Sequence, residues 1–241
     1  MMSESHETTD SATEQSVNRA PGGTRPQRPL HQPRPMDQLW ELNSSVPGLP
    51  DDAFIHDGLV TKRLIRASAL TALRPAESEM LWDLGAGAGS IMIEWLRAHP
   101  TTRAIGVERK PERRANGVAN LERFAVTDRG SIVLDDVENA VETLEDPDAI
   151  FIGGGLSSGI LQRCLTRLRP GGRFVAHGVT VEAEVSLAEA HARYGGELTR
   201  LTIENGDRIG AFRGWKPLRS VTMWSWVKPG DHSSDTGELN V

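Results

Sequence analysis

The sequence contains a single cysteine, Cys164, among 241 residues. One thiol cannot form a disulfide within the chain, and a metal site built from several cysteine ligands is excluded as well. Cys164 lies in the helical stretch ILQRCLTRLR, so we interpret it as a small buried residue rather than a nucleophile. The seven histidines are scattered without a pair at ligand spacing on a helix, and we predict no metal site.

Long apolar runs and an excess of basic residues are also missing. No stretch is long enough to span a bilayer, and the N-terminus lacks the apolar segment of a signal peptide. We therefore expect a cytoplasmic protein with no membrane partner. The formal net charge is −6, and five Phe and one Tyr offer few stacking groups, so we also expect no nucleic-acid partner.

Large apolar side chains are scarce at both ends of the chain, where Ser, Thr, Gln, Pro and Gly dominate. Such a composition buries too little surface to offset the conformational entropy lost on ordering. We predict disordered tails over residues 1–46 and 230–241, with one folded domain over residues 47–229.

Within this domain, strand and helix patterns alternate, which predicts an α/β fold with a mostly parallel sheet and helices on both faces. The last two strands have no helix between them, which predicts an edge hairpin with one antiparallel strand that packs Trp224 and Trp226. The expected strands lie near 79–85, 103–108, 131–136, 148–154, 173–179, 196–205 and 220–229, and the expected helices near 58–73, 90–99, 111–124, 137–144, 158–168 and 182–194.

The stretch LWDLGAGAGSIMIEW predicts a strand, a glycine turn and a helix, the arrangement that holds a nucleotide at the end of a parallel strand. Gly85, Gly87 and Gly89 form the turn. Asp83 precedes it, and Glu108 ends the next strand, where an acid binds a ribose diol. A pyrophosphate disfavours a neighbouring carboxylate, whereas a sulfonium tolerates it. The turn therefore favours S-adenosylmethionine over a dinucleotide.

Four segments together resemble the precorrin methyltransferases of cobalamin synthesis: DDAFIHDGLVTKRLIRASAL, LWDLGAGAGSIMIEW, DAIFIGGG and VTVEAE. The likeness runs from Pro47 to Pro229 and is strongest to the carbon-15 methylating, decarboxylating module of the precorrin-6Y methyltransferase family. Two positions depart from the family pattern, since Leu59 stands where Gln is frequent and His177 where Asn is frequent.

The resemblance implies a class I, Rossmann-like methyltransferase fold with a seven-stranded sheet and S-adenosylmethionine as cofactor. It implies methylation of a precorrin at carbon 15, with loss of carbon dioxide from the ring C acetate. Relatives are often fused to a carbon-5 methyltransferase domain, which is not recognisable here. We therefore expect a separate carbon-5 enzyme as a partner, and self-association into a homo-oligomer.

Eight residues are the expected cofactor-binding set. Thr61 has helix capping as an alternative role, and Asp136 has Asp135 as a nearly equal alternative. The set is Thr61, Asp83, Gly85, Gly87, Gly89, Glu108, Asp136 and Val137.

The acceptor implied by the resemblance carries many carboxylates, which favours basic residues at the mouth of the site. The expected substrate-binding residues are Lys62, Arg63, Arg66, Gly153, Gly154 and Gly155, with Arg109 and Lys110 as further candidates. For the catalytic step we select His177, Thr180 and Glu182, which follow the fifth strand. His177 could donate a hydrogen bond or transfer a proton, and a purely structural role is the alternative.

Two other functions fit the same features. One is a methyltransferase of this fold with RNA or a small metabolite as acceptor. The other is a non-catalytic cofactor-binding partner of a carbon-5 enzyme. The acidic charge argues against RNA, and the intact Asp83, glycine turn and Glu108 argue against the non-catalytic protein.

Overall fold

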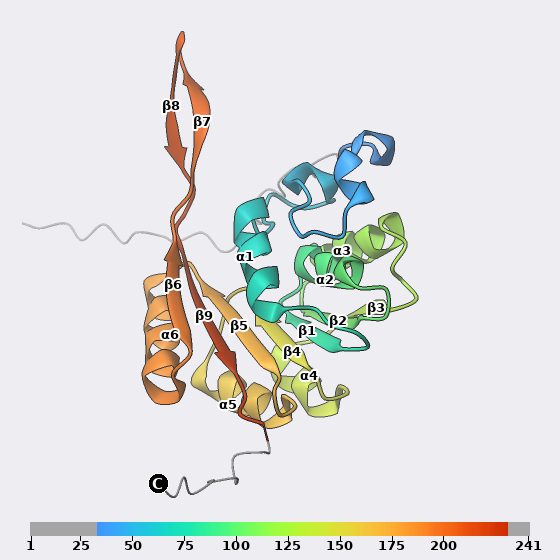
Figure 1. Cartoon of the computed structure of the whole chain (residues 1–241), viewed down its shortest axis with the longest axis vertical. Coiled ribbons are helices and arrows are strands. Elements are labelled where there is room, and N and C mark those ends of the chain that lie inside the picture. The colour runs from blue at the N-terminus through green and yellow to red at the C-terminus, as the bar shows by residue number, and fades with distance from the viewer. Residues whose placement is uncertain (1–32, 231–241) are drawn as a thin grey trace, which may run out of the picture.

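A computed structural model describes residues 33–230. Its seven-stranded sheet has the order β3-β2-β1-β4-β5-β9-β6, and a separate two-stranded hairpin, β7–β8, projects beyond it (Figure 1). Both faces of the sheet are covered by helices. The predicted α/β class is confirmed. Of the tails expected at 1–46 and 230–241, residues 1–32 and 231–241 lie outside the described residues.

The elements follow one another along the chain as the periodicity predicted, except near the two ends of the domain. The helices are α1 (Arg63–Leu73), α2 (Ser90–Ala98), α3 (Pro111–Arg123), α4 (Val137–Thr143), α5 (Ser158–Arg167) and α6 (Val181–Tyr194). The strands are β1 (Met80–Leu84), β2 (Arg103–Glu108), β3 (Gly130–Leu134), β4 (Ala149–Ile152), β5 (Arg173–Gly178), β6 (Glu197–Leu201), β7 (Glu204–Ile209), β8 (Phe212–Pro217) and β9 (Val221–Val227). Three short 3-10 helices precede them at Met36–Gln38, Trp40–Asn43 and Asp51–Ala53.

Strands β1 to β5 pair in parallel, and β9 is antiparallel to both of its neighbours. We expected β9 to lie at the edge of the sheet, which is wrong. Met223 of β9 is opposite His177 of β5 on one side and Thr199 of β6 on the other, so β6 forms the edge. Trp224 is therefore fully buried and packs against Phe174 and Trp226.

Alternate residues of each strand enter two separate cores. Leu81 and Phe151 face α1, α2 and α3, whereas Trp82 and Ile150 face α4, α5 and α6. Strands buried on both faces are the usual form of a parallel sheet. Cys164 lies in the second core, where burial raises the pKa of its thiol to about 12, in agreement with a packing role.

Residues 33–46 lie on the folded domain, although we expected order to begin at residue 47. Leu39 is 3% exposed, and Met36 and Leu42 pack against the first core. Arg34 also pairs with Asp52 at 2.9 Å. A few apolar side chains thus suffice to hold a segment whose average composition is polar.

The sequence did not predict the β7–β8 hairpin. Every residue of β7 is exposed, so the strand has no buried face to produce an alternating pattern. The turn between the two strands contains Gly210 at φ 59°, a left-handed conformation that favours glycine.

Candidate active site

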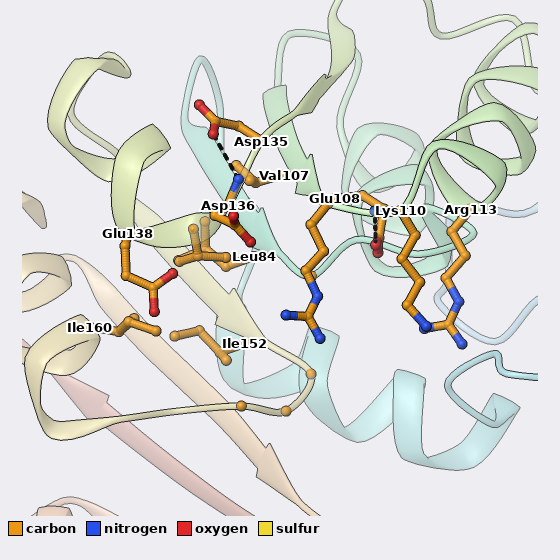
Figure 2. Close-up of a pocket in the computed structure, with 16 residues that line it drawn as sticks. Leu84, Val107, Glu108, Lys110, Arg113, Asp135, Asp136, Glu138, Ile152 and Ile160 are labelled. Carbon is orange, nitrogen blue, oxygen red and sulfur yellow. Dashed lines mark hydrogen bonds between the residues drawn. The ribbon is translucent and has the colours of Figure 1, made fainter. Parts of the chain in front are cut away.

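A pocket of about 420 Å³ opens where strands β1, β2, β3 and β4 end. In an open parallel sheet this edge is where ligands bind. The pocket is lined by Leu84, Gly85, Val107, Glu108, Arg109, Lys110, Arg113, Asp135, Asp136, Val137, Glu138, Ile152, Gly153, Gly154, Gly155 and Ile160 (Figure 2). It brings together seven residues of the expected cofactor-binding and substrate-binding sets, Gly85, Glu108, Asp136, Val137, Gly153, Gly154 and Gly155, and both further candidates, Arg109 and Lys110.

Of the three glycines in the turn, only Gly85 lines the pocket. Gly85, Gly87 and Gly89 have φ of 80°, 55° and 71°, conformations that other residues adopt only with strain. The amide of Gly85 donates a hydrogen bond to the carbonyl of Val107 at 2.8 Å, which ties the turn to β2. Gly87 and Gly89 do not line the pocket; their left-handed conformations give the turn its shape.

Glu108 connects the glycine turn to the loop after β2. Its Oε2 accepts a hydrogen bond of 3.0 Å from the Gly87 amide. Its Oε1 accepts one of 2.9 Å from the Lys110 amide, which Figure 2 shows. The side chain is buried yet lines the pocket. A carboxylate in this place can accept further hydrogen bonds from a pair of ligand hydroxyls.

Asp83 lies beneath the turn and does not line the pocket. Its Oδ2 accepts a hydrogen bond of 3.2 Å from the Met92 amide, near the beginning of α2. Burial raises the pKa of the Asp83 carboxyl to about 7; the Met92 amide opposes this shift, and the charge of Glu108 adds to it. A cation that approaches the turn would favour the ionised form of Asp83.

Opposite charges line the two sides of the pocket (Figure 2). Asp135, Asp136 and Glu138 lie on the side where β3 ends, and Lys110 and Arg113 lie on the side where β2 ends. Glu138 and Arg113 line the pocket but were not predicted as site residues from the sequence. Both lie in the first turn of a helix, and neither was marked by a motif.

The contacts of the two neighbouring acids favour Asp136 as the ligand-binding one. Oδ1 of Asp135 accepts hydrogen bonds from the Asp136 amide at 2.8 Å and from Asn139 Nδ2 at 3.2 Å. Asp136 is the N-cap residue of α4, but its carboxylate makes no capping hydrogen bond. Its oxygens are therefore available for a ligand.

Thr61, Lys62 and Arg63 lie outside this pocket, at the beginning of α1. Lys62, not Thr61, is the N-cap residue of that helix, so the capping alternative for Thr61 is wrong. Lys62 and Arg63 line a different cleft.

Arg66 was expected to bind substrate, and the structure contradicts this. Its side chain is fully buried, and its guanidinium forms an ion pair of 2.5 Å with Glu94. It also donates hydrogen bonds to the carbonyls of Leu49 and Thr61, and it lies 4.8 Å above the ring of Phe54. Arg66 is therefore a structural residue that fastens the segment before α1 to α2.

The three expected catalytic residues lie where β5 ends and α6 begins, outside the pocket lining. His177 is 4% exposed, and its Nε2 has no hydrogen-bond partner among the described residues. Burial lowers the pKa of its imidazole to about 4, and the edge of the ring meets Phe151 at a centroid distance of 5.0 Å. The hydroxyl of Thr180 caps α6 by accepting a hydrogen bond from the Ala183 amide, and Glu182 is exposed.

No helix within residues 33–230 has the length and apolar character needed to cross a membrane. Within the same range, no three His, Cys, Asp or Glu side chains are arranged so that they could hold a metal ion.

Comparison with known proteins agrees with this geometry. The chain is 46% identical over 182 residues to a Sinorhizobium precorrin-6Y C(5,15)-methyltransferase (decarboxylating), a match that covers 75% of this chain and 44% of that protein. The chain thus spans less than half of that relative. It is also 29% identical over 195 residues to the Salmonella typhimurium cobalt-precorrin-6B C(15)-methyltransferase (decarboxylating), a match that covers 78% of this chain and all of that protein.

Among solved structures, the C-terminal domain of the Rhodobacter capsulatus precorrin-6Y C5,15-methyltransferase matches with a TM-score of 0.74 and 40% identity. That match covers 77% of this chain and all of the other. The sequence model of the precorrin methyltransferase domain matches residues 52–228, which include all of the sheet and the pocket described above. The chain therefore belongs to the family of precorrin methyltransferase domains.

Proposed function

We propose that this chain is an S-adenosylmethionine-dependent C-methyltransferase. The observation that carries the proposal is the placement of two acids at successive strand ends beside the glycine turn. Glu108 follows β2 and would accept hydrogen bonds from the ribose hydroxyls. Asp136 follows β3 and would accept one from the adenine amino group. Val137 lines the same side of the pocket.

The remaining end of the cofactor suits the region around Asp83. Its buried carboxylate has no cationic partner in the described part of the chain, so a positively charged amino group of the cofactor would stabilise it. Thr61 is retained as a cofactor-binding prediction, although it lies outside the pocket lining. When bound, the cofactor supplies an electrophilic methyl group. The protein then has to align the acceptor carbon with it and exclude water.

We further propose that the acceptor is a precorrin, methylated at carbon 15 with loss of carbon dioxide from the ring C acetate. The names of two relatives support this part of the proposal. The Sinorhizobium protein is named for methylation at carbons 5 and 15, and the Salmonella typhimurium protein, which the alignment covers fully, for carbon 15 alone. The exposed Gly153, Gly154 and Gly155 would let a broad ring approach the backbone beside the cofactor.

His177 is the residue we propose for the acceptor's reacting region. It is neutral at physiological pH because burial opposes protonation, and its Nε2 has no hydrogen-bond partner within residues 33–230. A neutral imidazole can donate one hydrogen bond to an acetate carboxylate or accept one from a ring nitrogen. Thr180 and Glu182 stay predictions of lesser weight, because the Thr180 hydroxyl is engaged in capping α6.

The experiment is mass spectrometry of the purified chain incubated with S-adenosylmethionine and the reduced precorrin-6 intermediate. Gain of one methyl group together with loss of carbon dioxide supports the full proposal. Methyl gain without loss of carbon dioxide supports the transferase and contradicts decarboxylation by this chain. An unchanged macrocycle in the presence of bound cofactor contradicts the acceptor and favours the metabolite, RNA or non-catalytic alternatives.

A cytoplasmic location, a homo-oligomer and a separate carbon-5 methyltransferase complete the proposal. Light scattering coupled to size-exclusion chromatography measures the molar mass of the chain in solution and so tests the homo-oligomer. Co-purification with a carbon-5 methyltransferase tests that partnership.

A further inference from the structure

A second cleft, of about 480 Å³, lies between the beginning of α1 and the root of the β7–β8 hairpin. It is lined by Asp51, Lys62, Arg63, Leu64, Ile203, Asn205 and Leu218. Figure 1 shows the hairpin rising beside the end of α1 from which these basic residues come. The cofactor pocket uses none of these side chains.

The cleft lies at the same edge of the sheet as the cofactor pocket. Ile152, which lines that pocket, is opposite Ala176 of β5, and Gly178 at the end of β5 is opposite Thr222 of β9. Val221, the neighbour of Thr222, is opposite Leu201, where the chain leaves the sheet to form the hairpin. Strands β9 and β6 are thus the second and third neighbours of β4, about 10 Å and 15 Å away across the sheet. Ile203 and Leu218 of the cleft lie two and three residues beyond Leu201 and Val221. His177 lies between the two sites.

One wall of the cleft is apolar and faces solvent. Leu64 is 59% exposed, although it is a large aliphatic residue on the first turn of α1. Ile203 and Leu218 come from the two sides of the hairpin root, where the Leu218 amide donates a hydrogen bond of 2.8 Å to the Ile203 carbonyl. This bond makes the apolar wall a fixed part of the fold.

The other wall carries a surplus of positive charge. Lys62 lies 3.5 Å from Asp51, and Arg66, which lies 3.4 Å from Asp51, has its charge matched by Glu94. The Arg63 side chain is exposed and has neither a hydrogen bond nor an ion pair within residues 33–230. An unpaired guanidinium beside an apolar wall suits a ligand that is both apolar and anionic.

We propose that this cleft binds the methyl acceptor as an apolar ring system that carries carboxylates. The ring would lie against Leu64, Ile203 and Leu218, while Lys62 and Arg63 bind carboxylates at its rim. The hairpin root then forms part of the acceptor site, which no motif in the sequence had indicated. The inference rests on the proposed function, because it assigns that function's substrate to a place in the fold.

The test uses uroporphyrin, a fluorescent tetrapyrrole with carboxylates around its rim, as a probe that needs no turnover. Fluorescence anisotropy gives its Kd for the whole chain and for the variants Arg63→Gln and Ile203→Asn. Matched controls at the hairpin tip are Arg213→Gln and Ile209→Asn, which make the same chemical changes far from the cleft. Calorimetry with S-adenosylhomocysteine measures whether the cofactor site is intact in each variant.

We expect each cleft variant to weaken uroporphyrin binding by about tenfold, in line with the loss of one charge-assisted contact or one apolar contact. We expect changes below twofold in both controls and unchanged affinity for S-adenosylhomocysteine. Equal effects in cleft and tip variants would overturn the inference. So would an unaltered protein that does not bind uroporphyrin.

The methyl-transfer assay separates this inference from the proposed function. If the chain methylates the precorrin and the cleft variants leave its KM unchanged, the cleft is wrong and the function stands. If the chain transfers no methyl group but the cleft variants still weaken uroporphyrin binding selectively, the cleft stands and the proposed reaction is wrong.

Discussion

The amide of Gly87 donates a hydrogen bond of 3.0 Å to Oε2 of Glu108. This bond joins the middle of the glycine turn to the end of the neighbouring strand. The same carboxylate lines the pocket, so one side chain both sets the position of the turn and faces the ligand. Ligand affinity and turn geometry should therefore respond together to changes at Glu108.

Glu108→Gln tests this coupling. Gln retains an oxygen that can accept from the Gly87 amide, but it loses the charge that strengthens hydrogen bonds to ligand hydroxyls. We expect affinity for S-adenosylmethionine to fall about 10- to 100-fold, since a bond to a charged group contributes about 1.5–3 kcal/mol. Calorimetry measures the affinity, and circular dichroism verifies the fold. An unchanged Kd in a folded variant would contradict the ribose-binding role.

Asp83→Asn should change how stability depends on pH. The folded-state pKa of Asp83 is about 7, above its usual value of 3.8. Its contribution to stability is complete below about pH 4 and is lost as the pH rises to 7. Asn keeps an acceptor for the Met92 amide without this loss. We expect the variant to be more stable than the parent at pH 8 by up to about 4 kcal/mol, and less so at pH 5. Urea unfolding at both pH values measures the difference, and a constant difference would refute the assignment.

His177→Asn should act in the opposite direction. Burial lowers the folded-state pKa of His177 to about 4, from a usual 6.5. The stability it contributes is present above pH 6.5 and is lost as the pH falls towards 4. Because the Asp83 effect opposes this one in the same range, the comparison belongs in the Asp83→Asn background. There we expect His177→Asn to remove an acid-induced loss of up to about 3 kcal/mol at pH 4.5. Urea unfolding at pH 4.5 and pH 7 measures this loss in the Asp83→Asn protein with and without His177→Asn. If both proteins show the same difference in stability between the two pH values, the prediction is wrong.

Gly117→Ala should disturb the cofactor site from a position on α3 that does not itself line the pocket. A Cβ at this position of α3 would lie 2.4 Å from Ile132 Cδ1 and 2.9 Å from the carbonyl oxygen of Gly87. We expect destabilisation of about 1–3 kcal/mol together with weaker cofactor binding, because the glycine turn must shift.

Gly159→Ala is the matched control for this change. Its Cβ would meet nothing closer than Ser157 Oγ at 4.0 Å, so the usual helix preference for Ala should stabilise the protein by about 0.5–1 kcal/mol. Thermal unfolding and cofactor calorimetry compare the two. Equal cofactor affinity in both variants would show that α3 does not hold the turn in place.

The ion pair between Arg66 and Glu94 predicts strongly non-additive mutations. Glu94→Ala leaves a buried guanidinium without its partner and should cost about 3–5 kcal/mol. Arg66→Ala leaves the carboxylate, although the amides of Gly48 and Leu49 still donate to it. We expect the double variant to be less destabilised than the sum of the single variants, as measured by a double-mutant cycle in urea. Simple additivity would mean that the pair contributes no interaction energy.

The sequence was sufficient for the main sheet because its strands are buried on both faces. Apolar runs bounded by turn residues predicted β1, β2, β4 and β5 closely, and the glycine turn was located from its spacing. The position of β9 could not be read in this way. An apolar strand has the same pattern at the edge of a sheet as between two neighbours.

Pocket-lining residues were predicted where their place in a strand–helix unit determines their position. Residues whose role depends on a long-range contact were misassigned. Glu108 and Asp136 follow from strand ends. Arg66 was misassigned because its partner, Glu94, lies on a different helix and nothing local marks the pair. The β7–β8 hairpin was missed because an exposed strand leaves no apolar periodicity.

The place of β9 also has a consequence for the order of events during synthesis. The chain must make β6 and the whole β7–β8 hairpin before the strand that joins β6 to β5 leaves the ribosome. Until Val221–Val227 emerges, β5 has an open edge and β6 has no neighbour to pair with. Open edges of this kind recruit other strands. The nascent domain is thus exposed to aggregation from the emergence of β5 until Val221–Val227 has also emerged.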